Sequence, residues 1–240
     1  MTASAALESV SPTTISDAPA LCRQIVDEVQ KVFRGNRPAV KMVLTAVLAR
    51  GHVLFEDVPG VGKTTLARAF AHVLGASHNR IQFASDLMPA DIVGVGIFDP
   101  ATRTFEFKRG PIFCHVLLAD EINRTTPRTQ SALLEAMAEQ NVTVDGTTHT
   151  LEQPFIVLAT QNPREFHGTY PLPESQLDRF LIRLSIGYPV LDVERGLIRS
   201  HGAPMSLDGV KVMANPQRLL GLIEAAAAIH VSDEVLDYLH

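Results

Sequence analysis

The sequence predicts an α/β fold in which a mainly parallel sheet carries helices on both faces. The first observation is a set of short apolar runs with the length of buried strands, at residues 53–55, 115–119 and 155–159. The second is that segments with apolar residues at helical spacing precede and separate these runs. Strands that alternate with helices are typical of a parallel sheet, because the connecting helices pack against its faces.

The first third of the chain is expected to hold one core strand between helices. Residues 1–16 are rich in Ser, Thr and Ala, and we expect them to be disordered. Gly51 and Gly75 are placed where a helix would end. In order, we expect helices over residues 17–33 and about 38–49, the strand at 53–55, a helix that ends at Gly75, and a short strand near 80–83.

The middle of the chain is expected to hold two β-hairpins with a helix between them. Residues 92–98 and 104–108 flank a proline-containing turn, a pattern that predicts a hairpin. A second hairpin is expected around the Asp-Gly pair at 145–146, which favours a tight turn. Thr126 as N-cap and Pro127 as the first helical residue indicate where the helix begins.

Residues 52–67 combine a strand, a glycine turn and a helix in a way that is typical of a phosphate-binding loop. Such a turn directs backbone N–H groups and the positive end of a helix dipole at one point. Lys63 would reach the β- and γ-phosphates of a nucleotide, and the Thr64 hydroxyl would bind Mg²⁺. An ordinary glycine turn before an amphipathic helix is the alternative. The residues expected to bind ATP are Pro59, Gly60, Val61, Gly62, Lys63, Thr64 and Thr65.

An acidic pair, Asp120 and Glu121, follows the apolar run at 115–119. Asp120 would hold Mg²⁺ together with Thr64, and Glu121 would orient and deprotonate an attacking water. An acidic pair alone can simply mark the point where a strand leaves the core. Behind a phosphate-binding loop it predicts nucleotide hydrolysis, because strand ends of a parallel sheet meet at one ligand site.

Two further polar residues are candidates for the same chemistry. Asn162 follows the run at 155–159 and could contact the γ-phosphate or the attacking water; a turn before Pro163 is the alternative. Arg179 could be delivered to the γ-phosphate of a neighbouring chain, where such an arginine contributes on the order of 10³–10⁵ in rate. From the residues alone, a structural ion pair with Asp178 or Glu174 is the favoured reading of Arg179.

Composition argues against several other kinds of protein. The 240 residues carry a net charge of −5 without a long basic run, so nucleic-acid binding is not expected. No apolar stretch reaches membrane-spanning length, and residues 1–11 do not have the features of a secretory signal. The two cysteines and nine histidines show no metal-binding spacing. A cytoplasmic location is expected.

The motifs taken together are similar to those of the MoxR family of AAA+ ATPases, and the similarity extends over about residues 20–240. Asp57 departs from the general pattern G-x-x-x-x-G-K-[ST], where it replaces the first glycine, but resembles a variant of this family. The motifs that carry the resemblance are Gly62–Thr65, Leu117–Arg124, Thr129–Met137, Ala159–Pro163, Gly168–Pro173 and Leu177–Phe180.

This resemblance implies specific roles and partners. Lys63 and Thr64 match the Walker A motif of the family, and Asp120 and Glu121 match its Walker B motif. Asn162 matches the sensor 1 position, and Arg179 matches the arginine finger. The hairpin at about 94–108 resembles a family insertion that is a candidate substrate-facing element. Family members are ring hexamers and chaperone-like ATPases, which are thought to assemble protein complexes or insert metal cofactors. Their partners are often von Willebrand factor A-domain proteins.

The resemblance also suggests how the chain is divided. Residues 17–187 would form the αβα nucleotide-binding core, and residues 188–240 the start of a helical lid, with helical patterns at 193–200, 216–229 and 232–240. The last core strand is expected at 181–186. Family members have a fuller lid with a sensor 2 arginine, so we expect this lid to be incomplete and the chain to be part of a longer protein.

Three functions are therefore open. The first is a Mg²⁺-dependent ATPase that acts as a remodelling or assembly factor. The second is a nucleotide-gated interaction module with little turnover, which the incomplete lid suggests. The third is a DNA-directed motor, because related AAA+ proteins move DNA, but the acidic net charge argues against it.

Overall fold

The computed structural model describes residues 17–57, 60–162, 168–187, 195 and 207–239. A five-stranded parallel sheet in the order β2-β5-β8-β1-β9 forms the centre of the molecule. Its strands are β1 (His52–Glu56), β2 (His78–Gln82), β5 (Val116–Asp120), β8 (Ile156–Gln161) and β9 (Phe180–Leu184). The predicted parallel sheet is confirmed.

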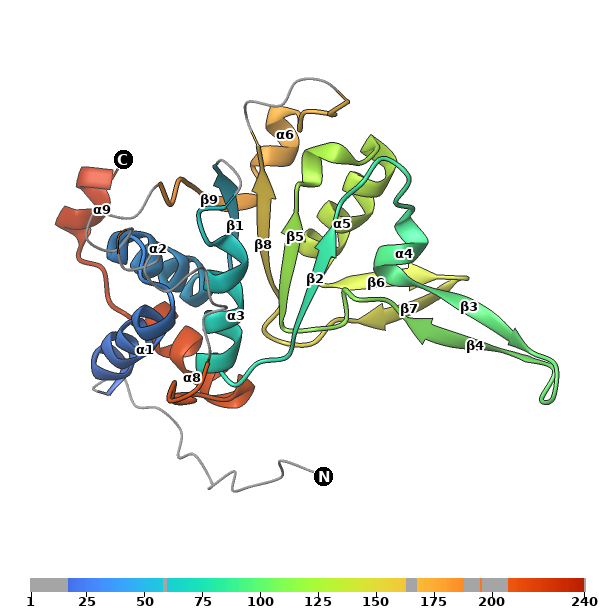
Figure 1. Ribbon diagram of the computed structural model, residues 1–240. Helices are drawn as coiled ribbons and strands as arrows, with labels where there is room; N and C mark the ends of the chain where they lie inside the picture. Colours follow the sequence, from blue (N-terminus) through green and yellow to red (C-terminus); the bar gives the residue numbers. More distant parts are fainter. Residues whose placement is uncertain (1–16, 58–59, 163–167, 188–194, 196–206, 240) are drawn as a thin grey trace.

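Helices cover both faces of this sheet (Figure 1). One face carries α1 (Ala18–Val32), α2 (Arg37–Leu48), α3 (Lys63–Val73) and α8 (Pro216–Ala227), and the other carries α5 (Pro127–Glu139). Because side chains alternate along a strand, Val53 and Phe55 join the apolar core under α1, whereas Leu54 joins the core under α5. The apolar runs that predicted strands are therefore buried on both sides.

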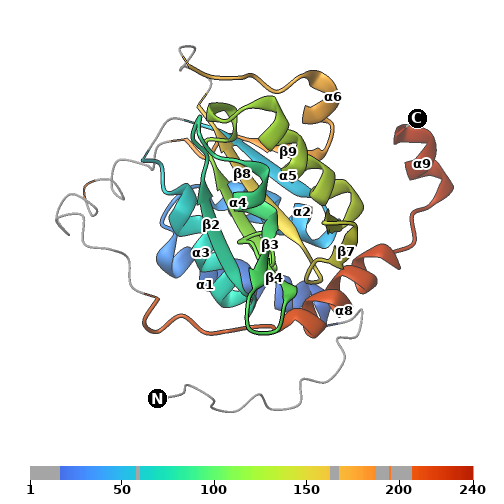
Figure 2. The same ribbon diagram turned by 90° about the vertical axis from the view of Figure 1, so that its right-hand side faces the viewer.

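Two antiparallel hairpins lie beyond the α5 side of the sheet. One consists of β3 (Gly94–Asp99) and β4 (Thr104–Arg109), the other of β6 (Asn141–Val144) and β7 (Thr147–Thr150). Figure 2 faces the side from which β3 and β4 project. Near their tip, Phe98 and Phe105 pack with ring centroids 5.4 Å apart and are still 51% and 73% exposed. Both predicted hairpins are confirmed.

Several boundaries differ from the predicted ones for a local physical reason. The first hairpin begins at Gly94 rather than residue 92, because a short helix, α4 (Pro89–Val93), precedes it. Gly94 has a φ of 102°, a value that glycine adopts readily, and it is the residue at which the chain passes from α4 into β3. The last core strand ends at Leu184, since the backbone at Ile186 instead donates to the Asp57 carboxylate.

The segment after the sheet contains α8 and α9 (Asp233–Leu239). Leu219 and Leu222 of α8 share the apolar core of α1, so this part of the expected lid packs on the core. Of the helix predicted at 193–200, the structure describes only residue 195, which is helical, and the segment 1–16 lies outside the described residues. Among the described helices, none has the length and apolarity needed to cross a membrane. The division of the chain near residue 187 stays a prediction.

Candidate nucleotide-binding and hydrolysis site

The carboxyl ends of β1, β5 and β8 meet at one pocket of about 360 Å³. Parallel pairing of these neighbouring strands brings their ends together, as is usual for ligand sites in open α/β sheets. Arg179 is not among the described residues that line the pocket, and Pro59 lies outside the described residues. The lining residues are Gly60, Gly62, Lys63, Thr64, Thr65, Arg80, Gln82, Asp120, Glu121 and Asn162.

The phosphate loop passes directly into α3. Gly60 and Gly62 have φ values of 86° and 93°, and Gly62 is the residue that precedes the helix. The first N–H groups of α3 have no partner within the helix and can bind an anion there. The Val61 side chain is buried in the core, which leaves its backbone to form the loop.

Lys63 lies at the start of α3 and lines the pocket. Its Nζ donates a hydrogen bond to the backbone oxygen of Asp57 at 3.0 Å. Burial lowers the pKa of Lys63, and the nearby carboxylates of Asp120, Asp57 and Glu121 oppose that shift. A charged amine is therefore held half-buried among acidic groups, where a polyphosphate can provide a strong counter-charge.

Asp57, which replaces the first glycine of the general loop pattern, has a structural role. Its buried carboxylate oxygen Oδ2 accepts hydrogen bonds from the backbone N–H groups of Ile186 and Gly187 and from the Ser185 hydroxyl at 3.2 Å. These three donors come from the segment that follows β9. The departure from the general pattern thus attaches the phosphate loop to the end of the neighbouring strand β9.

Asp120 is oriented by two side chains that the sequence did not identify as site residues. The Thr160 hydroxyl donates to Asp120 Oδ1 at 2.6 Å and accepts from the Glu121 N–H at 2.9 Å. Arg80 forms an ion pair with Asp120 Oδ2 at 2.7 Å. Neither Thr160 nor Arg80 could be found from the sequence, because their positions beside Asp120 depend on how β5 pairs with β8 and with β2.

Glu121 is held in a defined position at the edge of the pocket. It has a φ of 59°, in the left-handed region that residues other than glycine adopt infrequently. Its carboxylate oxygen Oε2 accepts hydrogen bonds from Gln82 Nε2 at 2.8 Å and from Arg124 NH1 at 3.0 Å. These donors orient the carboxylate and also occupy one of its oxygens.

Asn162 and Arg179 have different surroundings. Asn162 is 7% exposed and lines the pocket, and its backbone oxygen accepts from Asn123 Nδ2 at 3.5 Å. The Arg179 guanidinium donates to the backbone oxygen of Leu134 at 2.5 Å. Within the described part of the chain, Arg179 forms no ion pair with Asp178 or Glu174, so the structural ion pair that the residues alone favoured is wrong.

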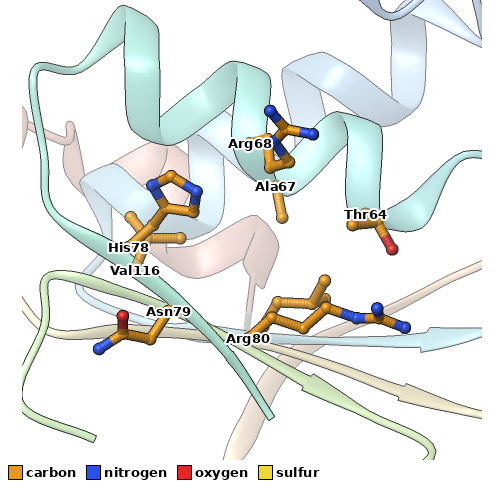
Figure 3. A pocket seen from close by; sticks show the side chains of 8 residues that line it. Thr64, Ala67, Arg68, His78, Asn79, Arg80 and Val116 are labelled. Carbon is orange, nitrogen blue, oxygen red and sulfur yellow. The ribbon is translucent and has the colours of Figure 1, made fainter. Parts of the chain in front are cut away.

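The donor set at this pocket suits Mg²⁺. Hydroxyl and carboxylate oxygens are the ligands that Mg²⁺ prefers, and Thr64 and Asp120 supply one of each. Asp120 already attracts a cation here, the guanidinium of Arg80. A second pocket of about 120 Å³ lies between α3 and β2 and shares Thr64 and Arg80 with the first (Figure 3). Arg80 thus lines both cavities.

Fold and pocket together define a phosphate-loop nucleotide-binding protein, and comparisons with known proteins specify the family. Residues 52–182 match the ATPase family associated with various cellular activities (AAA). The chain is 43% identical to Chaperone MoxR1 of Mycobacterium tuberculosis over 211 residues, and these residues cover 88% of this chain and 55% of that protein. It is 33% identical over 167 residues to Protein MoxR of Methylorubrum extorquens, with coverages of 68% and 48%. The chain belongs to the MoxR family of AAA+ ATPases.

Two other relatives match over most of this chain. The uncharacterized protein YeaC of Bacillus subtilis is 45% identical over 223 residues, which cover 93% of this chain and 70% of YeaC. A crystal structure from Cytophaga hutchinsonii, described as a candidate ATPase, superposes with a TM-score of 0.83 at 35% identity, covering 93% of this chain and 69% of that one. The predicted AAA+ α/β fold is confirmed, and the chain spans about half the length of the MoxR relatives.

Proposed function

We propose that this chain binds ATP with Mg²⁺ and hydrolyses it to ADP and phosphate. The observation that supports this most is that Lys63, Thr64, Asp120, Glu121 and Asn162 line one pocket at the carboxyl ends of the strands. A phosphate-binding loop, a pair of metal-binding oxygens and a positioned carboxylate are the parts that phosphoryl transfer to water requires. Membership of the AAA ATPase family supports the same activity.

The side chains divide the reaction between them. Lys63 and the first N–H groups of α3 bind the phosphates, and Asn162 contacts the γ-phosphate or the water. Glu121 accepts a proton from the water as its oxygen bonds to the γ-phosphorus, and the bond from that phosphorus to the ADP oxygen breaks. Thr64 and Asp120 would hold Mg²⁺, which would neutralise phosphate charge. Arg80 must release Asp120 for this arrangement to form.

Arg179 would serve a neighbouring copy of the chain. Its guanidinium is held on α5 and it does not line the described pocket of its own chain. An arginine that stabilises the γ-phosphate from another subunit requires that each pocket lies at a subunit boundary. We therefore propose a ring, most simply a hexamer as in this family, in which each chain supplies Arg179 to the next pocket.

For the whole protein we propose a chaperone-like role in the cytoplasm, in which ATP hydrolysis remodels or assembles protein complexes or inserts a metal cofactor. The name of the relative MoxR1, a chaperone, supports this role. The exposed Phe98 and Phe105 at the tip of the first hairpin could contact a protein client. A von Willebrand factor A-domain protein is a candidate partner. The net charge of −5 argues against a DNA-directed motor.

A nucleotide-gated interaction module with little turnover is the second candidate, and one observation favours it. Gln82 and Arg124 both occupy Oε2 of Glu121, the carboxylate that would activate water. If these contacts persisted with ATP bound, the chain would bind nucleotide tightly and hydrolyse it slowly. Binding would then depend on Lys63, and turnover would not depend on Glu121.

Steady-state Mg²⁺-ATPase assays of the parent chain and of Glu121→Gln decide between the two candidates. We expect Glu121→Gln to lower the rate by on the order of 10²-fold or more, because the general base is lost, while nucleotide affinity stays within a few fold. Glu139→Gln makes the same chemical change at an exposed position of α5 and should leave the rate unchanged. Equal rates in the parent and Glu121→Gln would refute hydrolysis at this site.

A further inference from the structure

A single buried side chain joins the turn after Glu121 to the segment that carries Arg179. Gln130, on α5, is 2% exposed. Its amide nitrogen Nε2 donates to the backbone oxygens of Ile122 at 3.0 Å and Tyr170 at 2.9 Å. A weaker contact to the backbone oxygen of Thr125 is 3.3 Å long. All three acceptors are main-chain groups, so the amide fixes the path of two separate backbone segments.

The first of these segments follows the residue proposed to activate water. Glu121 is succeeded at once by a short 3-10 helix, η1 (Ile122–Arg124). Glu121 has a φ of 59° and is the residue that directly precedes this helix. A shift of the Glu121 backbone on nucleotide binding would therefore reach the carbonyl oxygen of Ile122, the next residue.

The second segment, residues 168–173, is bound to the same 3-10 helix. The Tyr170 N–H donates to the backbone oxygen of Asn123 at 2.7 Å, while the Tyr170 oxygen accepts from Gln130. Tyr170 is thus held through both of its backbone groups. One bond leads directly to the turn after Glu121 and the other leads to α5.

Downstream of Tyr170 the chain forms α6 (Glu174–Leu177) and reaches Arg179. In Figure 1, α6 lies at the end of the sheet toward which the arrows of β5 and β8 point. The Arg179 guanidinium returns to α5 and binds the backbone oxygen of Leu134. Leu134 lies four residues after Gln130, on the same face of α5. Helix α5 therefore holds the segment from Tyr170 to Arg179 at both of its ends.

We propose that Gln130 is a positioning residue that couples the nucleotide state of its own pocket to the placement of Arg179 for the neighbouring pocket. This inference rests on the proposed function, in which Arg179 acts in the next subunit. Gln130 touches neither nucleotide nor metal, since it is not among the described residues that line the pocket. In this proposal, a shift of Glu121 moves η1 and with it the backbone oxygen of Ile122, to which the Gln130 amide is bonded. The amide then moves Tyr170, its other acceptor, and with Tyr170 the segment that leads to Arg179.

A mixing experiment tests this coupling with the full chain. Glu121→Gln subunits cannot hydrolyse ATP but still present Arg179, so they should restore ATPase activity to Arg179→Ala subunits. We expect donors that carry both Glu121→Gln and Gln130→Met to restore at least tenfold less activity. The Met side chain has similar length and no amide. Donors with Glu121→Gln and Gln217→Met, the same change at an exposed position of α8, should restore activity fully.

The outcomes separate the inference from the proposed function. Full restoration by the Gln130→Met donors would overturn the positioning role and leave hydrolysis with a shared Arg179 intact. No restoration even by donors with Gln130 would overturn the shared Arg179, and the coupling with it. The nucleotide affinity of the Gln130→Met chain should stay within a few fold of the parent value. This control shows that the substitution leaves the nucleotide pocket intact, because damage to the pocket would lower the affinity much further.

Amide hydrogen exchange provides a readout that does not require assembly of the double variant. In the Glu121→Gln chain, addition of Mg²⁺-ATP should change the exchange rate of residues 168–173 by at least threefold. The same addition should leave that rate unchanged when Gln130→Met is also present. An unchanged rate in the chain with Gln130 intact would contradict the coupling directly.

Discussion

At the scale of single residues, Asp57 shows how a departure from a general motif can have a structural purpose. A glycine at this position could form the loop but could not accept hydrogen bonds from residues 185–187. The carboxylate attaches the phosphate loop to the segment after β9. The sequence pattern indicated that a family variant was present, but the partners lie far along the chain and could not be predicted from it.

Asp57→Gly should therefore destabilise the protein, although it restores the general pattern. Three donors lose a charged acceptor, and we expect the free energy of unfolding to fall by about 2–4 kcal/mol. Urea denaturation measures this change, and Asp57→Asn, which keeps one acceptor oxygen, should lose less. Parental stability in the Asp57→Gly chain would show that these hydrogen bonds contribute nothing.

His52 illustrates a histidine whose role is structural. It is 5% exposed; its Nδ1 accepts from the Val157 N–H at 3.0 Å, so its Nε2 carries the proton that is donated to the Met137 oxygen at 3.3 Å. Burial lowers the pKa of His52 from 6.5 to about 4. Both ring nitrogens are occupied, so the folded protein holds the neutral ring.

This pKa predicts a pH dependence of stability. In the unfolded chain, His52 has its ordinary pKa of 6.5 and binds a proton more readily than in the folded protein. The contribution of the neutral, buried His52 to the free energy of unfolding is therefore fully present above pH 6.5 and is lost as the pH falls toward 4. Between pH 7 and pH 4 this one group should lower the free energy of unfolding by about 3 kcal/mol. Urea denaturation of the parent and His52→Gln across this range should show a correspondingly smaller loss in the variant. An equal loss of the free energy of unfolding in the parent and in His52→Gln would contradict the structural role of neutral His52.

At the scale of secondary-structure elements, the pairing of β5 with β8 places Thr160 beside the acidic pair. The strands themselves could be predicted, because each is an apolar run of suitable length. Their register could not, since it depends on packing that no single strand encodes. The contributions of Thr160 and of Gln82, which reaches Glu121 from β2, therefore became visible only in the folded sheet.

Thr160→Val tests the importance of this register. Valine has nearly the same shape, so the strand should remain packed while Asp120 and the Glu121 backbone lose their shared hydroxyl partner. We expect the ATPase rate to fall on the order of 10²-fold, because a small misplacement of reacting groups is enough for such a loss. Thr147→Val at the exposed start of β7 is the control. A parental rate in Thr160→Val would refute the positioning by Thr160.

At the scale of the whole molecule, two apolar cores on opposite faces of one sheet support a site that neither core contains. The meeting of Lys63, Asp120 and Asn162 at one edge could be predicted, because carboxyl ends of parallel strands lie together. The contact of the Arg179 guanidinium with α5 could not, since the residues alone favoured an ion pair with its sequence neighbours. Its contact with Leu134 instead leaves room for a role outside its own pocket.

The measurement that most directly tests hydrolysis at shared pockets is the Mg²⁺-ATPase rate per chain as a function of protein concentration. It should be made on the parent chain, on Arg179→Ala and on a mixture of Arg179→Ala with Glu121→Gln. We expect the parent rate per chain to rise with concentration as chains associate, Arg179→Ala to be nearly inactive, and the mixture to regain activity. A rate per chain that is independent of concentration, with no recovery in the mixture, would contradict the proposal that Arg179 completes the site of a neighbour.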